Sequence, residues 1–219
     1  MSTLPSPAPD DPVPVVSSWL AEIVSSGRLK NPNAMALATS DRAGAPSVRM
    51  VLLKEIAPAG YAVFYSNYQS RKGGELDENP RAAAVLYWEP LGRQVRFEGP
   101  VVRSPAAESD AYFATRPTLS QINAWSSAQS RPLAQPADLE RAADKAARQF
   151  GVERGAAAPP RPVPRPAHWG GYRLWFETVE LWAEGAHRFH ERLRYRRDLE
   201  RSDAHAYRAG AWSAERLQP

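Results

Sequence analysis

The segments AAAVLYW (82–88) and RQVRFEG (93–99) decide the fold class of this chain. In the second segment, Val95 and Phe97 alternate with polar residues, which is the period-two pattern of a strand buried on one face. The turn between the two segments is short. Strands joined by short turns favour an antiparallel barrel or sandwich over a doubly wound parallel sheet.

Similar segments surround this pair on both sides. They are AMALATS (34–40), SVRMVLLKEI (47–56), YAVFYS (61–66), YRLWFETVELW (172–182), RFHERLRY (188–195) and AWSAERL (211–217). We expect each to form a strand, with the last ones closing the sheet that the first ones begin. Helices are expected over 15–24, over 105–115, from Pro117 and from about Pro136. The sequence therefore predicts a mostly β fold with flanking helices, of the α+β class.

Three segments have the composition of loops. Residues 1–14 are rich in proline and small polar residues, and we expect them to be disordered. The proline-rich segment 155–166 reads as a connector, and 198–210 reads as an enlarged turn. The remaining chain, 15–219, suits one domain with a single core.

Composition excludes several classes of chemistry. The 219 residues include no cysteine, which excludes disulfides, zinc–thiolate sites, iron–sulfur clusters and cysteine nucleophiles. The four histidines form no HExxH pattern, so we expect no metal site. The net charge of +4 is spread along the chain without a run of five like charges. This charge suits a small phosphorylated ligand better than nucleic acid.

Nothing in the sequence predicts a membrane span or a secretion signal. No window approaches eighteen consecutive apolar residues, and the beginning of the chain lacks a basic start followed by an apolar stretch. We therefore expect a cytoplasmic protein with no membrane partner.

Basic residues cluster around two of the expected strands. Arg49 and Lys54 stand at the two ends of RMVLLK, and Arg71 with Lys72 directly follows another strand. Each could be an ordinary solvated residue at a strand end. Together they suit a single phosphate, to which Ser66 and Ser70 would add hydroxyl donors.

Two further patterns place donors on one face of an element. Tyr112, Arg116 and Ser120 follow at i, i+4 and i+8, although Pro117 interrupts a continuous helix. An exposed helix face remains the alternative. In RFHER, Arg188, His190 and Arg192 alternate on one side of the expected strand, opposite Phe189. Three such side chains on one face need solvent or an anionic or electron-rich ligand. No nucleotide-binding or nucleophile motif accompanies these clusters.

At these same residues the sequence resembles the pyridoxine 5′-phosphate oxidase family. The matching blocks are RMVLLK (49–54), FYSNYQSRK (64–72), ENPRAA (78–83), RQVRFEG (93–99), YFATRPTLSQINAWSSAQS (112–130), ELWAEGAHRFHERLRY (180–195) and ERLQP (215–219). They follow the family order from about residue 30 to the end of the chain. The resemblance implies an antiparallel split β-barrel that forms a homodimer, with FMN bound between the subunits.

The resemblance also implies roles for particular residues. It implies that FMN is contacted by Arg49, Met50, Val51, Leu52, Leu53, Lys54, Tyr65, Ser66, Arg71, Lys72, Gln94, Gln129, Ser130, Trp182 and Arg192, partly from the partner subunit. It implies that the substrate phosphate is clamped by Lys54, Tyr112, Arg116 and Ser120. Arg188 and His190 would be the catalytic pair, over the pyridine ring beside the carbon that is oxidised.

The implied reaction oxidises pyridoxine 5′-phosphate or pyridoxamine 5′-phosphate to pyridoxal 5′-phosphate, and dioxygen is reduced to hydrogen peroxide. A related FMN oxidase of phenazine precursors is an alternative, as is a flavin- or pyridoxal-phosphate-binding barrel without turnover. The four clamp residues favour the phosphorylated substrate. One departure concerns residues 1–14, which lack the arginines and the tyrosine found near the beginning of many family members.

Overall fold

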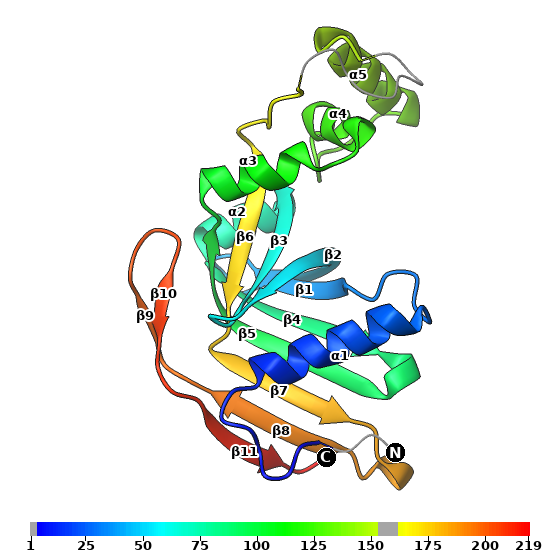
Figure 1. Ribbon diagram of the computed structural model, residues 1–219. Helices are drawn as coiled ribbons and strands as arrows, with labels where there is room; N and C mark the ends of the chain where they lie inside the picture. The colour runs from blue at the N-terminus through cyan, green and yellow to red at the C-terminus, as the bar shows by residue number, and fades with distance from the viewer. Residues whose placement is uncertain (1–3, 153–161) are drawn as a thin grey trace.

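Six antiparallel strands close into a barrel in the computed structural model, which describes residues 4–152 and 162–219 (Figure 1). They are β1 (Ala34–Ser40), β2 (Pro46–Ala57), β3 (Tyr61–Asn67), β4 (Arg81–Trp88), β5 (Arg93–Arg103) and β6 (Trp169–Trp175). Hydrogen-bonded neighbours follow the order β5-β4-β1-β2-β3-β6, and β6 pairs back onto β5. The predicted antiparallel barrel with flanking helices is confirmed.

Strand β5 belongs to the barrel and also to a sheet that extends from it. Its residues 101–103 pair with β6, whereas residues 93–98 pair with β7 (Thr178–Ala183). Gly99 lies between these two pairings. A Cβ atom built on Gly99 would lie 2.0 Å from the carbonyl oxygen of Trp175, so a side chain at this position would collide with the backbone. Glycine therefore permits the split of the sheet at this point.

The prediction of one strand over 172–182 was wrong, because the chain changes partners within it. Strand β6 ends at Trp175 and β7 begins at Thr178. Between them, the Phe176 N–H donates to Gly60 and the Glu177 N–H donates to the carbonyl of Glu98. Phe176 is fully buried and its ring stacks on Phe97 at 4.3 Å. The break thus carries the chain from the barrel to the extension.

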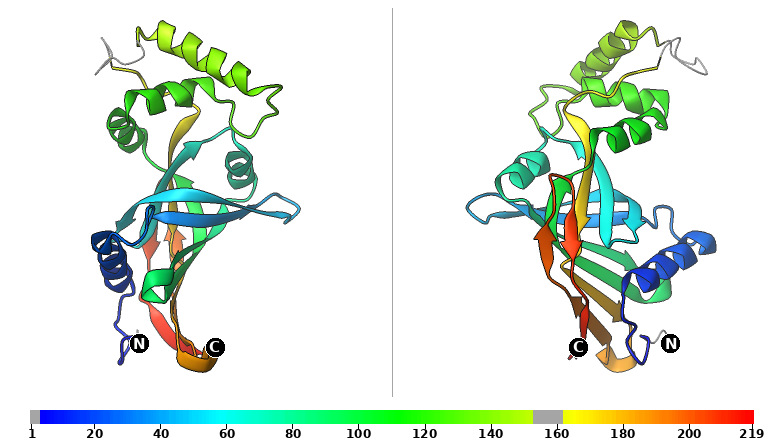
Figure 2. Two further views of the ribbon diagram at one scale, coloured as in Figure 1. Left: turned by 90° about the vertical axis from the view of Figure 1, so that its right-hand side faces the viewer. Right: turned by 60° about the vertical axis from the view of Figure 1, so that its left-hand side comes forward.

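The extension continues from β7 through β8 (Glu191–Arg196) to β11 (Ser213–Leu217). Between β8 and β11, a separate hairpin consists of β9 (Leu199–Arg201) and β10 (Tyr207–Ala209). This hairpin occupies the segment that was expected to be an enlarged turn. Figure 2 shows the extension at one end of the molecule and the helices α3 to α5 at the other.

Five α-helices and two short 3₁₀ turns flank the strands in the described residues. They are α1 (Val13–Ser26), α2 (Arg71–Glu78), α3 (Ala106–Ala114), α4 (Thr118–Ser126), α5 (Pro136–Gln149), η1 (Glu89–Leu91) and η2 (Ala186–Arg188). Pro117 precedes α4 directly instead of occupying its first position. Helix α2 was not predicted, because its two glycines lower helix propensity. No helix in the described part of the chain is long and apolar enough to cross a membrane.

Two hydrophobic clusters hold the elements together. The larger lies between the barrel strands, the extension and α1, and a smaller one joins β6 to α3, α4 and α5. Leu4 is 4% exposed and belongs to the larger cluster, although residues 1–14 were expected to be disordered. Its N–H donates to Glu191 at 3.2 Å. Most of the 155–166 connector lies outside the described residues.

The variant Gly99→Ala is expected to destabilise the fold, because the new methyl group would meet the Trp175 carbonyl. We expect the free energy of unfolding to fall by about 1–3 kcal/mol, as in other overpacked sites. Urea denaturation followed by circular dichroism measures this change. Gly74→Ala is the matched control, since a Cβ atom at Gly74 meets nothing within 4 Å. Equal losses in the two variants would contradict the crossing assigned to Gly99.

Candidate active site

A polar cavity near the predicted residues lies between the barrel and the helices α3 and α4. It has a volume of about 460 Å³, and β2, β3, β6, α3 and α4 contribute to its lining. Lys54, Tyr112, Arg116 and Ser120 all line it. The structure therefore brings together the four residues that were expected to clamp a phosphate, although they come from three elements and a turn.

The turn between α3 and α4 places Arg116 beside Tyr112 and Ser120. The Arg116 N–H donates to Phe113 at 3.2 Å, and the Ser120 N–H donates to Pro117 at 2.8 Å. Pro117 has no N–H to donate to a carbonyl of α3, so α3 ends before it and α4 begins directly after it. Pro117 thus separates two helices, so Tyr112, Arg116 and Ser120 line one cavity instead of lying along the face of a single helix.

Arg116 carries a positive charge without an acidic partner. Its Nη1 atom is buried and has no hydrogen-bond partner, and within residues 4–152 and 162–219 it forms no ion pair. Its guanidinium lies over the ring of Trp169 at 4.6 Å and near that of Phe113 at 5.5 Å. Burial lowers the pKa of Arg116, but arginine stays charged in proteins. An anionic ligand in the cavity would satisfy this cation.

Aromatic rings form one wall of the same cavity. Tyr65 stacks on Tyr112 with ring centroids 3.9 Å apart, and Trp169 continues the stack at 5.4 Å from Tyr65. The Lys54 ammonium lies 5.5 Å from the Tyr112 ring centroid. Such flat, polarisable surfaces with a polar edge suit a planar ligand with a charged tail. Trp169 was not predicted as a site residue, since nothing in the sequence relates it to Arg116.

A second cationic cluster lies at the beginning of α2. Lys72 is 7% exposed, and its ammonium donates to Ser66 at 2.9 Å, Ser70 at 3.0 Å and Gln129 at 3.0 Å. All three acceptors are neutral. Burial, with a smaller contribution from the charge of Arg49, lowers the pKa of Lys72 to about 8. A buried ammonium without a carboxylate in contact is costly unless an anion binds beside it.

Arg49 and Arg71 meet at the buried carboxylate of Glu75. Arg49 Nη2 donates to Glu75 Oε2 at 3.0 Å, and Arg71 Nε donates to Oε1 at 2.8 Å. Burial raises the pKa of Glu75, but hydrogen bonds from Ser47, Thr39 and the two arginines outweigh this effect and lower it to about 2. A smaller cavity of about 400 Å³ beside this group is lined by Arg49, Met50, Arg71, Lys72, Gln129 and Ser130, among others.

Strand β2 presents its predicted cofactor residues unequally. Met50 is 62% and Leu52 is 44% exposed, and Val51 is half-buried. Leu53 is 2% exposed and lies in the larger core. Its N–H donates to the carbonyl of Asn33, and its own carbonyl accepts from the Asn33 side chain. Leu53 therefore serves the barrel, whereas Met50 and Leu52 remain available to a ligand or a partner.

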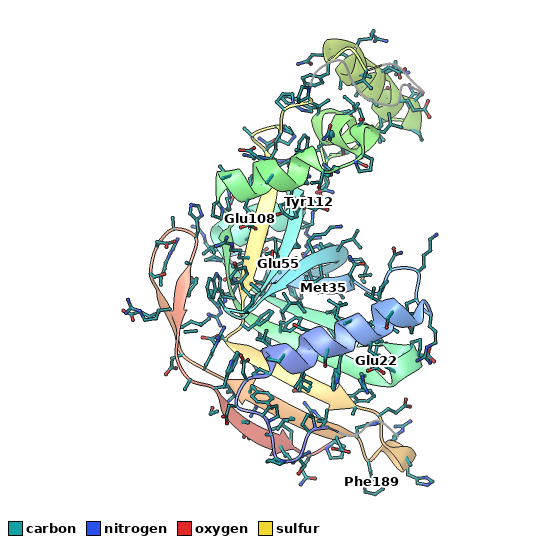
Figure 3. All side chains as sticks on the ribbon, viewed as in Figure 1. Glu22, Met35, Glu55, Glu108, Tyr112 and Phe189 are labelled. Carbon is teal, nitrogen blue, oxygen red and sulfur yellow. The ribbon has the colours of Figure 1, made fainter. Side chains whose placement is uncertain are left out.

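The remaining predicted residues form a separate group on the extension. Gln94 on β5 faces Trp182 on β7, which in turn faces Arg192 on β8, and the His190 ring lies 4.7 Å from the Trp182 ring. Neither cavity described above includes these residues or Arg188. Figure 3 shows Tyr112 beside α3, well separated from Phe189 at the outer end of the extension. One protomer therefore does not bring Arg188 and His190 to the phosphate clamp.

The expected strand over 188–195 begins only at Glu191, so the predicted alternation across RFHER was wrong. The preceding residues form the turn η2, in which His187 and Arg188 have φ angles of 54° and 66°. Phe189 is 76% exposed instead of facing a core. Two consecutive non-glycine residues at positive φ carry strain, which is typical of functional loops.

Fold and cavities together define a split β-barrel protein with two cavities lined by basic residues on one protomer. Residues 25–150 match the family described as pyridoxamine 5′-phosphate oxidase, and residues 169–219 match the pyridoxine 5′-phosphate oxidase C-terminal dimerisation region. This chain belongs to the pyridoxamine 5′-phosphate oxidase family.

Relatives with known names agree with this assignment. A pyridoxine/pyridoxamine 5′-phosphate oxidase of Salinibacter ruber is 46% identical over 210 residues, which cover 96% of this chain and 90% of the relative. One of Cereibacter sphaeroides is 44% identical over 212 residues, which cover 97% of this chain and 96% of the relative. The crystal structure of PhzG from Burkholderia lata 383, in complex with tetrahydrophenazine-1-carboxylic acid, has a TM-score of 0.81 and 31% identity. The match covers 98% of this chain and 95% of that one.

The variant Lys72→Met is expected to change how the stability of the ligand-free protein depends on pH. A lysine in an unfolded chain has a pKa of about 10.4, whereas folded Lys72 loses its proton near pH 8. Between these values the unfolded chain holds more protons, so stability rises with pH. Relative to Lys72→Met, the wild-type free energy of unfolding should rise by roughly 1.4 kcal/mol per pH unit there. Urea denaturation across this range measures the difference, and parallel curves for the two proteins would contradict it.

Proposed function

We propose that this chain oxidises pyridoxine 5′-phosphate and pyridoxamine 5′-phosphate to pyridoxal 5′-phosphate, with FMN as cofactor and dioxygen as the final acceptor. The observation that carries this proposal is a pair of cations in two separate cavities: Lys72, which is buried, and Arg116, which is half-buried with its Nη1 atom shielded from solvent. Among the described residues, no carboxylate forms a hydrogen bond or ion pair with either side chain. The reaction needs two phosphorylated ligands at once, each with roughly 1.5–2 negative charges on its phosphate, and the chain offers two matching sites.

The cluster at α2 suits the phosphate of FMN. Ser66, Ser70 and Gln129 hold the Lys72 ammonium in place, and Arg71 lies one residue away at the beginning of the helix. Lysine and arginine donors around an anion at a helix beginning form charge-assisted hydrogen bonds with phosphate oxygens. The residues present therefore fit the cofactor that the resemblance implies.

The cavity at α3 and α4 suits the substrate. Arg116, Tyr112 and Ser120 would bind the substrate phosphate, and Lys54 lies on the side of the cavity that leads along β2. Clamping the remote phosphate fixes the position of the pyridine ring, which lowers the entropic cost of reaching the reactive geometry. The stacked ring of Tyr65 lies beside that of Tyr112, where a planar ring could pack.

A second copy of the chain completes the site in this proposal. Arg188, His190, Trp182 and Arg192 line neither of the two cavities of their own protomer. The C-terminal part of the chain, which carries all four, matches a dimerisation region. An apolar stripe on β2 offers a surface that a partner would cover. It comprises Val48, Met50 and Leu52, which are 69%, 62% and 44% exposed.

The chemistry divides between the cofactor and the protein. FMN, which Arg49, Arg71 and Lys72 would hold, would supply the two-electron chemistry that takes a hydride from the substrate carbon and reduces dioxygen to hydrogen peroxide. The N–H of Gly185 donates to His190 Nδ1 at 3.3 Å. A neutral imidazole whose Nδ1 accepts carries its proton on Nε2. His190 Nε2–H is then free to orient the substrate hydroxyl or amine, and Arg188 to stabilise negative charge on the substrate.

Oxidation of a phenazine precursor is the second candidate, which the similarity to PhzG favours. The names of the relatives with 44–46% identity and the four clamp residues in one cavity support the phosphorylated substrate more strongly. We also propose that the enzyme acts in the cytoplasm, as expected from the sequence.

The direct test is turnover by purified protein loaded with FMN. We expect aldehyde formation and stoichiometric hydrogen peroxide with pyridoxine 5′-phosphate in air, because both ligand sites are present in the chain. Unphosphorylated pyridoxine, as the control, should react far more slowly. Binding of FMN without turnover of either phosphorylated substrate would contradict the proposed oxidase and favour a binding protein. Turnover of a dihydrophenazine alone would favour the second candidate.

The variant Arg116→Ala is expected to impair use of the phosphorylated substrate and to leave FMN bound. Loss of a charge-assisted hydrogen bond of about 1.5–3 kcal/mol corresponds to a fall of roughly 10–100-fold in kcat/KM. Most of it should appear in KM, because the phosphate is remote from the reacting carbon. Arg141→Ala, which removes an exposed arginine on α5, is the control. An unchanged KM in Arg116→Ala would exclude the phosphate clamp.

A further inference from the structure

Glu75 is a buried acid that pairs with Arg49 and Arg71, two of the residues lining the cavity where an anion is expected to bind. It is 6% exposed and lies on α2, between the arginines of β2 and of its own helix. Its oxygens accept hydrogen bonds from Thr39, Ser47, Arg49 and Arg71. A carboxylate at an anion site either competes with the ligand for the cations or holds those cations in place. The contacts of the two arginines distinguish these roles.

Arg49 is already largely occupied by protein acceptors. Its Nη1 atom donates to the carbonyl of Leu37 at 3.2 Å and to Thr39, and its Nη2 atom donates to Ser47 and Glu75. This use of both terminal nitrogens fixes the guanidinium between β1 and β2. Arg49 therefore adds positive charge to the cavity more than it adds free donors.

Arg71 has the complementary arrangement. Its Nε atom donates to Glu75 Oε1 at 2.8 Å. Its two terminal nitrogens form no hydrogen bond or ion pair with any other described residue. Its side chain is 63% exposed, so without Glu75 it would sample many rotamers. Anchoring through Nε leaves the two terminal N–H groups as a pair, which is the geometry that binds two phosphate oxygens.

The net charge of the cluster also supports a role for Glu75 in holding the two arginines in place. Arg49, Arg71 and Lys72 bring three positive charges, and Glu75 brings one negative charge, which leaves an excess of two. A phosphate monoester carries roughly 1.5–2 negative charges near neutral pH. The group thus becomes nearly neutral when a phosphate binds. In the ligand-free protein Glu75 reduces the mutual repulsion of the three cations.

We propose that Glu75 is a positioning residue that anchors Arg71 through its Nε atom and so prepares the terminal N–H pair of Arg71 for the FMN phosphate. The inference rests on the proposed function, because it takes FMN as the ligand of this site. Preorganisation of an exposed side chain strengthens binding by removing the entropy that the ligand would otherwise have to restrict. Glu75 itself needs no contact with FMN for this role.

The test is a double-mutant cycle on FMN binding by the ligand-free full chain. The dissociation constant is measured from the quenching of FMN fluorescence, which needs no turnover. We expect Glu75→Ala to weaken binding by about tenfold or more, as outer-shell partners of bound groups typically do. Glu75→Gln keeps an oxygen that can accept from Arg71 Nε, so it should recover part of the loss. In an Arg71→Ala background, Glu75→Ala should have a much smaller effect.

Controls separate this role from a loss of folding. Glu78→Ala removes an exposed acid of the same helix and should leave the dissociation constant unchanged. Circular dichroism shows which variants fold, and Glu75→Gln carries the test if Glu75→Ala does not. Unchanged or tighter binding in a folded Glu75 variant would overturn the proposal, as would an equal loss with and without Arg71. Failure of the wild-type chain to bind FMN would instead contradict the proposed function.

Discussion

The split of strand β5 determines where every part of the site lies. At Gly99 the strand stops pairing with β7 and begins to pair with β6, and the Trp175 carbonyl approaches so closely that no side chain fits. One half of β5 closes the barrel, and the other half carries the extension with β8. The cavities therefore form beside the barrel strands, at α2, α3 and α4, whereas the turn that precedes β8 lies at the outer end of the extension, where Figure 3 labels Phe189. One protomer does not bring them together, which agrees with the match of residues 169–219 to a dimerisation region.

Beside the barrel, positively charged side chains that are partly or wholly removed from solvent indicate where ligands bind. Lys72 and Arg116 are held by neutral or aromatic partners, Ser66, Gln129 and Trp169 among them. Such cations lower the stability of the ligand-free protein, because no ion pair offsets the loss of their hydration. An anion that binds beside them would offset this loss of stability. Stability and affinity are thus linked, and a bound phosphate should stabilise the fold. Glu75 differs, since its two arginines form ion pairs that limit repulsion before the ligand arrives.

The sequence predicted those features that depend on local periodicity. Alternation in 93–99 identified the central strand, and the spacing of Tyr112, Arg116 and Ser120 drew attention to three donors that line one cavity in the structure. Features that depend on distant partners were missed. The break within 172–182 has no glycine or proline and arises only because β5 changes neighbours there. The turn at Arg188 needs positive φ at residues that usually avoid it, so the alternating pattern wrongly indicated a strand. The resemblance, and not periodicity, supplied FMN and the oxidase reaction.

The central claim is that each active site combines the phosphate cavity of one subunit with the η2 turn of the other. Co-expression of Arg116→Ala and Arg188→Ala chains with different tags tests it most directly. At substrate concentrations well below KM, each variant alone should be severely impaired, whereas purified mixed dimers should regain about half of the wild-type kcat/KM, because one of their two symmetric sites has both residues intact. If mixed dimers were no more active than the two parent variants, both residues would belong to the same subunit's site, and the account would be contradicted.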